Sequence, residues 1–211
     1  MRALADKLDP AHAALLIVDM ENDFVHPEGK GAKRGNRPLG HIQAIIPEIQ
    51  RLLAAARGAG AFVAHIQHTT LRDGLSESGP WLDARMKAPY SAVDVCLEGT
   101  WGHQIIDQLQ PADGEAVVHK YRYGGFVGTN LELVLRSAGV RTVVCCGAAT
   151  NVCVEATARE AFSHEFYVVL PRQACGSWNA DLHNATLTTA EARYAAVCDV
   201  GEVLDRWGDG A

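Results

Sequence analysis

The chain has 211 residues, of which 48% are hydrophobic, and a formal net charge of −6. This length suits one domain with one substantial core, so we expect a single domain over residues 1–211. The acidic balance argues against a general nucleic-acid or anionic-membrane binder. No apolar run approaches the ~20 residues of a membrane span, and residues 1–10 lack the apolar core of a signal peptide.

Helical and strand patterns alternate along the chain. A continuous apolar run predicts a buried strand at 13–18, and apolar positions at helical spacing predict a helix over 42–57, ending at Gly58 and Gly60. Residues 69–100 are rich in Gly, Ser, Pro and charge, and predict a long loop with short helical pieces. The remaining expected elements are strands at 61–66, 116–119, 141–146, 166–170 and 196–200 and helices at 102–109, 129–137, 151–163 and 181–192. This alternation predicts an α/β fold with a doubly wound sheet.

Three chemically useful residues each follow a predicted strand. They are Asp19, Lys120 and Cys153. Alone, the first could be a turn residue, the second a solvated cation and the third a small buried helix residue. Sites in doubly wound sheets lie beyond the carboxyl ends of the strands, so we expect all three at one edge. Together they would supply a proton acceptor, a cation and a nucleophile.

Cys153 stands at the predicted start of a helix, after a strand and a turn of small residues. The partial positive charge and unpaired N–H groups of a helix N-terminus favour a thiolate. The sequence therefore predicts a lowered pKa for the Cys153 thiol. The six cysteines have no CxxC spacing, and Cys145 and Cys146 are adjacent in a predicted buried strand, which indicates reduced thiols in a cytoplasmic protein.

Four segments resemble the isochorismatase-like cysteine hydrolases, which include nicotinamidases, N-carbamoylsarcosine amidases, ureidoacrylate amidases and biuret hydrolases. The segments are 16–24, 119–126, 128–131 and 147–154, and they occur in the family's order. The resemblance implies a three-layer, mostly parallel sheet with helices on both faces. It also implies a general base at Asp19, the cation at Lys120 and the nucleophile at Cys153, with no cofactor.

The resemblance extends to the backbone and to assembly. It implies a cis peptide between Ala148 and Ala149, and an oxyanion hole formed by the N–H groups of Ala149 and Cys153. It also implies a homodimer or homotetramer. We expect a small-molecule substrate in contact with Phe24, Gln67, Trp101, Tyr123 and Ala148.

Two further stretches bear on the substrate. Nicotinamidases commonly hold a metal with one Asp and two His after the second strand, but His65, His68 and Asp73 lack the Asp-x-His order, so we expect no metal site. Histidines three apart on a strand also point to opposite faces. Four cations in the stretch 30–37 predict a solvated loop, or alternatively a cap on a neighbouring subunit's active site.

The pattern at 99–102, the pair Tyr123 and Phe126, and the run 149–155 look most like the ureidoacrylate amidase and biuret hydrolase branch. We therefore expect a metal-independent amidohydrolase that cleaves a C–N bond of a small amide, ureido, carbamoyl or lactam compound through a thioester. The alternatives are a nicotinamidase- or isochorismatase-type hydrolase, and a non-catalytic binding scaffold. Aromatic residues such as Trp81 could wall the pocket.

Overall fold

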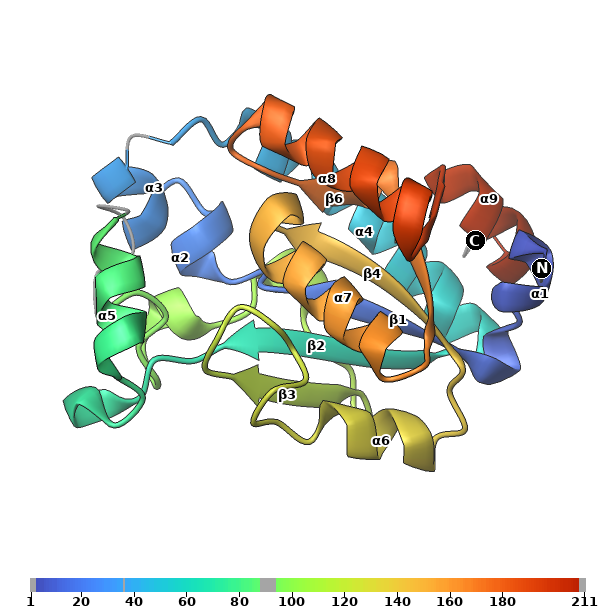
Figure 1. Cartoon of the computed structure of the whole chain (residues 1–211), viewed down its shortest axis with the longest axis horizontal. Helices are drawn as coiled ribbons and strands as arrows, with labels where there is room; N and C mark the ends of the chain where they lie inside the picture. The colour runs from blue at the N-terminus through green and yellow to red at the C-terminus, as the bar shows by residue number, and fades with distance from the viewer. Residues whose placement is uncertain (1–2, 36, 88–93, 209–211) are drawn as a thin grey trace.

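The computed structural model describes residues 3–35, 37–87 and 94–208. In these ranges a parallel sheet of seven strands forms the centre of the molecule (Figure 1). Six strands lie in the order β3-β2-β1-β4-β5-β7, and β6 pairs with β4 beyond the end of β5. The strands are β1 (Ala13–Val18), β2 (Phe62–His68), β3 (Ala116–Lys120), β4 (Thr142–Ala148), β5 (Tyr167–Pro171), β6 (Cys175–Gly176) and β7 (Ala196–Cys198).

Helices cover both faces of the sheet, as predicted. The helices α4 and α9 share one buried apolar cluster with the sheet, and α6, α7 and α8 share the other. The bounds are α1 (Leu4–Lys7), α2 (Asn22–Val25), α3 (Lys30–Gly35), α4 (Gly40–Ala59), α5 (Gly79–Met86), α6 (Leu131–Ser137), α7 (Glu155–Ser163), α8 (Ala180–Arg193) and α9 (Val200–Trp207). None of the described helices is long and apolar enough to cross a membrane.

Strand β1 shows why the sequence folds into three layers. All six of its residues are buried, with Leu15 and Ile17 in the cluster of α4 and Leu16 and Val18 in the cluster of α6 to α8. Successive side chains of a strand point to opposite faces, so a continuous apolar run needs a helical layer on each side. Strands β2 and β4 flank β1 and share its parallel register.

The structure differs from the predicted elements in several places, and the short helices α1, α2 and α3 were not predicted. The expected helix at 102–109 is two separate 3₁₀ turns, Trp101–His103 and Asp107–Leu109. The last strand ends at Cys198, and α9, which was not predicted, begins after Asp199. The predicted helix at 151–163 starts with a π-helical turn, Thr150–Val154, before α7. By contrast, the long loop with short helical pieces predicted over 69–100 is confirmed for its described residues, which contain a 3₁₀ turn, Arg72–Gly74, and α5; residues 88–93 lie outside the described ranges.

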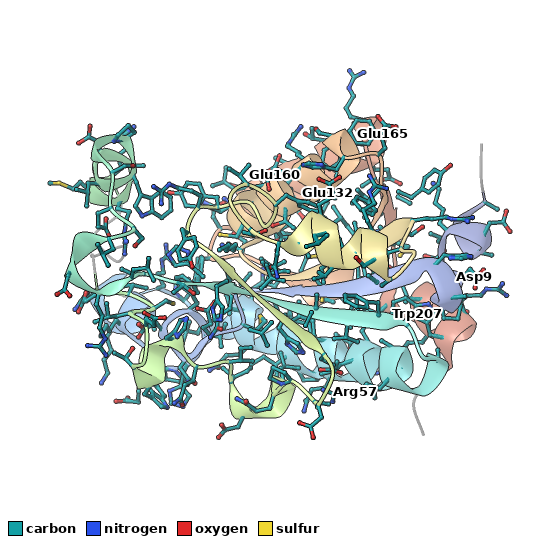
Figure 2. The ribbon with its side chains drawn as sticks, turned by 90° about the horizontal axis from the view of Figure 1, so that it is seen from below. Asp9, Arg57, Glu132, Glu160, Glu165 and Trp207 are labelled. Atoms are coloured by element: carbon teal, nitrogen blue, oxygen red, sulfur yellow. The ribbon has the colours of Figure 1, made fainter. Side chains whose placement is uncertain are left out.

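The two ends of the described chain meet far from the carboxyl edge of the sheet. The indole Nε1 of Trp207 donates a hydrogen bond to the carbonyl of Leu8 at 2.9 Å. Figure 2 shows Trp207 at the same end of the molecule as Asp9. The arrowheads of β2, β3 and β4 point to the opposite end, where α2, α3 and α5 lie (Figure 1).

Candidate active site

Three strand ends bring the predicted catalytic side chains into contact. Asp19 follows β1, Lys120 is the last residue of β3, and Cys153 lies in the turn after β4. The Lys120 ammonium Nζ is 2.9 Å from Oδ2 of Asp19. The Cys153 thiol lies beside both side chains, close enough for each of them to shift its pKa. The arrangement puts an acid, a cation and a thiol in one contact group.

The backbone around Asp19 fixes its position. Asp19 adopts a left-handed conformation with φ 53°, which Asp tolerates better than most residues. Its N–H donates to the carbonyl of Ile66 at 2.9 Å, so the residue stays attached to β2 as the chain leaves the sheet. On the other side, Gly147 has φ 115°, and a Cβ there would lie 2.1 Å from the carbonyl oxygen of Val18. Only glycine allows β4 to approach β1 this closely.

Lys120 is fully buried, which is costly for a cation unless it is paired. Its Nζ also donates to the carbonyl of Arg122 at 3.1 Å. Burial acts to lower the pKa of Lys120, but the neighbouring Asp19 carboxylate, with a smaller effect of Cys153, outweighs it and raises the pKa above its ordinary value. The side chain is therefore an ammonium ion at neutral pH.

Burial also governs the thiol, and here the sequence-based prediction is wrong. The pKa of Cys153 lies well above its ordinary value, because burial and the neighbouring Asp19 carboxylate outweigh the ammonium of Lys120. Burial likewise raises the pKa of Asp19, against the lowering effects of Lys120 and Cys153. A carboxyl group is ordinarily a stronger acid than a thiol by about four to five pKa units, so we assign the shared proton to Cys153 in the resting protein.

The turn that holds Cys153 is tightly bonded. The carbonyl of Ala149 accepts from the N–H groups of Val152 and Val154, and the hydroxyl of Thr157 donates to the carbonyl of Cys153 at 2.7 Å. The peptide between Ala148 and Ala149 is cis, as the family resemblance implies. All six cysteines lie in the described ranges, and Cys153 alone among them is not fully buried.

A cavity of about 120 Å³ opens onto Asp19 and Cys153. Three of the predicted substrate contacts, Phe24, Tyr123 and Ala148, line this cavity. The other two, Gln67 and Trp101, are placed elsewhere. The Gln67 amide donates to the carbonyl of His103, and Trp101 is 47% exposed with its ring edge-on to His26 at 5.0 Å.

The cavity also has lining residues that the sequence did not assign to the substrate. They are Arg37, His68, Arg85, Val95, Val152 and Trp178, whereas Trp81, which was expected as a possible wall of the pocket, also lines the cavity. The stretch 30–37 was expected to be a solvated loop, but residues 30–35 form α3 and Arg37 lines the cavity of its own chain. This placement results from contact between distant segments, because the Arg37 guanidinium packs on Trp178, 3.8 Å from its ring centroid. No local pattern in the sequence encodes that contact.

A second carboxyl group, Glu21, is buried near Asp19. Its Oε2 accepts the N–H of His68 at 3.0 Å, and its carboxyl lies close to Cys96. Burial, with the negative charge of Asp19, raises the pKa of Glu21 well above its ordinary value. Glu21 therefore keeps its proton to a higher pH than an exposed glutamic acid does.

Asp23 organises the loops that form the cavity walls. Its Oδ1 accepts the N–H of Lys30 at 2.9 Å, at the start of α3, and its Oδ2 accepts the N–H of Cys96 at 2.8 Å. A Cβ on Gly102 would lie 2.3 Å from the same carboxylate. One buried carboxylate thus joins α3 to two stretches of the long loop region.

The two histidines considered as metal ligands lie in different surroundings. Nε2 of His65 is 3.0 Å from Oε2 of Glu115, whereas His68 lines the cavity. The described residues contain no group of three His, Cys, Asp or Glu side chains arranged to hold a metal ion.

Comparisons with known proteins agree on the family. The isochorismatase domain model matches residues 13–202. The chain is 34% identical over 205 residues to the ureidoacrylate amidohydrolase RutB of Agrobacterium fabrum, covering 92% of this chain and 90% of that protein. A cysteine hydrolase from Pseudomonas syringae pv. phaseolicola superposes with a TM-score of 0.85 and 28% identity, over 96% of this chain and 95% of the other. An isochorismatase family protein from Desulfovibrio vulgaris gives a TM-score of 0.78 and 29% identity, over 92% and 96%. The chain therefore belongs to the isochorismatase family of hydrolases.

Proposed function

We propose that this hydrolase is an amidohydrolase that cleaves a C–N bond of a small amide, ureido, carbamoyl or lactam compound, with Cys153 as nucleophile. The observation that carries the proposal is the mutual contact of Asp19, Lys120 and Cys153 at the floor of a small cavity. The similarity to a ureidoacrylate amidohydrolase favours the ureido or carbamoyl class within that range.

In the first half-reaction the thiol proton of Cys153 passes to Asp19 as the sulfur attacks the carbonyl carbon. A C–S bond forms, and the carbonyl π electrons move onto oxygen. The N–H groups of Ala149 and Cys153 would stabilise this oxyanion, a role typically worth about 10²–10³ in rate for one donor. Asp19 then returns the proton to the leaving nitrogen, the C–N bond breaks, and ammonia or an amine departs.

In the second half-reaction Asp19 accepts a proton from water, and the oxygen attacks the acylated carbon. The C–S bond breaks and the proton returns to the sulfur of Cys153. For a simple amide the intermediate is a thioester and the product a carboxylic acid. For a carbamoyl substrate the intermediate can be a thiocarbamate, which yields carbamate and then carbon dioxide and ammonia.

Lys120 acts by charge in both steps. A nearby ammonium lowers the free energy of the thiolate and of the ionised Asp19 relative to their neutral forms. The thiol pKa is raised in the resting site, so at neutral pH the thiol gives up its proton as the sulfur attacks the substrate carbonyl. The proposed route uses no metal ion, because Asp19 supplies the base and Lys120 the compensating charge.

A substrate screen tests the proposal. Ammonia release would be measured from ureidoacrylate, biuret, N-carbamoyl amino acids, nicotinamide and cyclic amides, with Cys153→Ala as the blank. We expect turnover of at least one ureido or carbamoyl compound, which dialysis against EDTA does not reduce. Turnover by the Cys153→Ala variant, or loss of turnover that is restored only by an added metal, would contradict the proposal.

A further inference from the structure

We propose that Glu160 is a positioning residue for the reaction: from α7 it fixes the loop 121–126, which brings Tyr123 into the wall of the active-site cavity. The inference rests on the proposed function for the role of Cys153, and it assigns a task to a residue that does not itself line the cavity. Glu160 lies on the helix that follows the nucleophile turn, and the loop begins directly after Lys120 at the end of β3.

The first observation is the contact between Glu160 and the backbone of the loop. The Oε2 atom of Glu160 accepts the N–H of Phe126 at 2.8 Å. The other carboxylate oxygen, Oε1, lies against Gly124, where an added Cβ would be only 1.9 Å from it. Figure 2 shows Glu160 beside the loop that connects β3 and α6. One carboxylate thus holds the loop backbone at two points.

The second observation is that the preceding turn of α7 holds the nucleophile. Thr157 is three residues before Glu160, so the two side chains are neighbours on the surface of the helix. The Thr157 hydroxyl donates to the carbonyl of Cys153 at 2.7 Å. The loop lies against the same threonine, because a Cβ on Gly125 would be 3.0 Å from its Cγ2. One side of α7 therefore contacts both the backbone of the nucleophile and the loop, and sets the distance between them.

The third observation is what the loop brings to the site. Tyr123 lines the cavity and packs edge-on against Trp81, with 4.9 Å between the ring centroids. Tyr123 is 41% exposed, so its position depends on the backbone that carries it as well as on packing. The carbonyl of Arg122 accepts a hydrogen bond from Nζ of Lys120 at 3.1 Å. A shift of this short loop would therefore move a wall of the cavity and an acceptor of the buried ammonium together.

The loop has a second anchor, which separates a positioning role of Glu160 from a purely structural one. The ring of Phe126 is buried and stacks on that of His164, with 5.0 Å between the centroids, so the far end of the loop stays attached to the core. Loss of the Glu160 carboxylate should therefore release the part of the loop that carries Tyr123 while the fold and the contact of Asp19, Lys120 and Cys153 remain.

Alkylation of Cys153 by two reagents of different size tests the inference. Iodoacetamide and iodoacetanilide share one reactive group, but the second also carries a phenyl ring. Each rate would be measured by mass spectrometry of the peptide that contains Cys153, and divided by the rate of the same reagent with N-acetylcysteine. The fixed wall of wild type should slow iodoacetanilide more than iodoacetamide. In Glu160→Ala the ratio of the bulky to the small reagent should rise about tenfold, the effect of losing a hydrogen bond to a charged group, with the iodoacetamide rate within about threefold of wild type.

Gly124→Ala disrupts the same contact from the side of the loop. Gly124 has no positive φ, so alanine suits its backbone, but the added Cβ would overlap the Glu160 carboxylate and displace it from Phe126. The reagent ratio should therefore rise as it does in Glu160→Ala. In the double variant the Cβ occupies the space that the carboxylate leaves, so the two effects should not add.

Two further variants separate position from charge and from helix stability. Glu160→Gln keeps an oxygen that can accept the Phe126 N–H, and should hold the reagent ratio within about threefold of wild type. Arg159 is the neighbour of Glu160 on α7, but its Nε donates to Glu155 at 2.9 Å and its guanidinium lies over another ring, that of Tyr194. Arg159→Ala should leave the ratio within about twofold of wild type, since an exposed pair of this kind contributes little.

The outcomes separate this inference from the proposed function. With ureidoacrylate as substrate, Glu160→Ala should raise KM about tenfold and leave kcat within about threefold of wild type, since the wall and not the reacting groups has moved. If wild type hydrolyses neither ureidoacrylate nor any other compound of the screen, the proposed function fails, and the reagent ratios alone decide the inference. Ratios within about twofold of wild type in both Glu160→Ala and Gly124→Ala overturn it. A loss in Glu160→Gln equal to that in Glu160→Ala, or a parallel change in the rates of both reagents, overturns it as well.

Discussion

At the scale of single residues, Asp19 and Cys153 share one proton, and the Lys120 ammonium balances the one negative charge that they carry between them. Asp19→Asn removes the proton acceptor and Lys120→Ala removes the charge that favours the thiolate, so kcat should fall about 10²–10⁴-fold in each variant. Cys153→Ser should bind substrate without turning it over, because an alcohol loses its proton far less readily than a thiol. Steady-state kinetics of single and double variants checks this.

The losses should also be far from additive, since the three residues act as one unit. Retention of more than about a tenth of wild-type kcat by Asp19→Asn or Lys120→Ala would rule out the assigned roles, because it lies well outside the acid–base range.

The thiol itself can be followed by alkylation. Iodoacetamide should modify Cys153 before Cys145, Cys146 or Cys198, since Cys153 alone among the six cysteines is not fully buried and has Asp19 beside it as a base. The rate should increase with pH, because the Cys153 pKa is raised and the thiolate is the reactive form. Mass spectrometry of tryptic peptides after short exposures would identify the site. Equal modification of all six cysteines in the folded protein would argue against a preferential reactivity of Cys153.

Glu21 should make stability depend on pH. Its pKa is raised in the folded state, so its favourable contribution is complete below the unfolded-state value near 4.5 and is lost as the pH rises toward the folded-state value. Replacing it with the neutral isostere in Glu21→Gln removes this loss. The free energy of unfolding of the variant, relative to that of wild type, should therefore increase by up to about 1.4 kcal/mol per pH unit above pH 4.5.

Urea unfolding at pH 5, 6, 7 and 8 measures this difference. Glu48, paired with Arg51 on α4, gives the control variant Glu48→Gln, which should run parallel to wild type. A constant offset between Glu21→Gln and wild type across these pH values would show that Glu21 is ionised in the folded protein.

At the scale of elements, the closest backbone approach is between β1 and β4. Gly147→Ala should cost about 2–5 kcal/mol, because a Cβ meets the Val18 carbonyl at 2.1 Å and the φ of 115° is strained for other residues. Gly58→Ala is the control. It lies in α4 with no atom within 4 Å of its added Cβ, and it should raise stability by up to about 1 kcal/mol. Thermal or urea unfolding would compare the two, and equal effects would contradict the close-approach argument.

Elements with a strong local pattern could be predicted from the sequence. The run that became β1 is apolar throughout, the run that became β4 is apolar after Thr142, and α4 ends in a left-handed glycine, Gly60. The start of α9 was missed although its signal is present: Asp199 and Glu202 form a capping box, with the Glu202 carboxylate accepting the Asp199 N–H at 2.8 Å. The region 102–109 is different, because two 3₁₀ turns of three residues carry no helical period that a sequence pattern could reveal.

The candidate site, too, could be predicted only in part from the sequence. Topology predicted that Asp19, Lys120 and Cys153 would meet, because the carboxyl ends of parallel strands share an edge. The cavity walls depend on contacts between segments far apart in sequence, such as Arg37 with Trp178. No local sequence pattern reveals such contacts. The raised thiol pKa was missed for a related reason, since burial is a property of the folded surroundings rather than of the helix start.

At the scale of the whole molecule, we expect a homodimer or a homotetramer. The described surface leaves large apolar side chains exposed, among them Leu133 at 67% and Phe162 at 51%. Exposed apolar area of this kind is often covered by a second copy in closed assemblies. Light scattering at micromolar concentration should give two or four times the chain mass of 22.7 kDa. A mass of one chain would refute the expectation.

The hydrogen bond between Trp207 and Leu8 has a practical consequence. It fastens α9 to the end of α1, on the side of the sheet away from α2, α3 and α5 (Figure 1). A tether attached at either terminus therefore leaves the mouth of the cavity facing outward. The protein can be immobilised on a solid support through a terminal tag and still exchange substrate and product with the flowing solution.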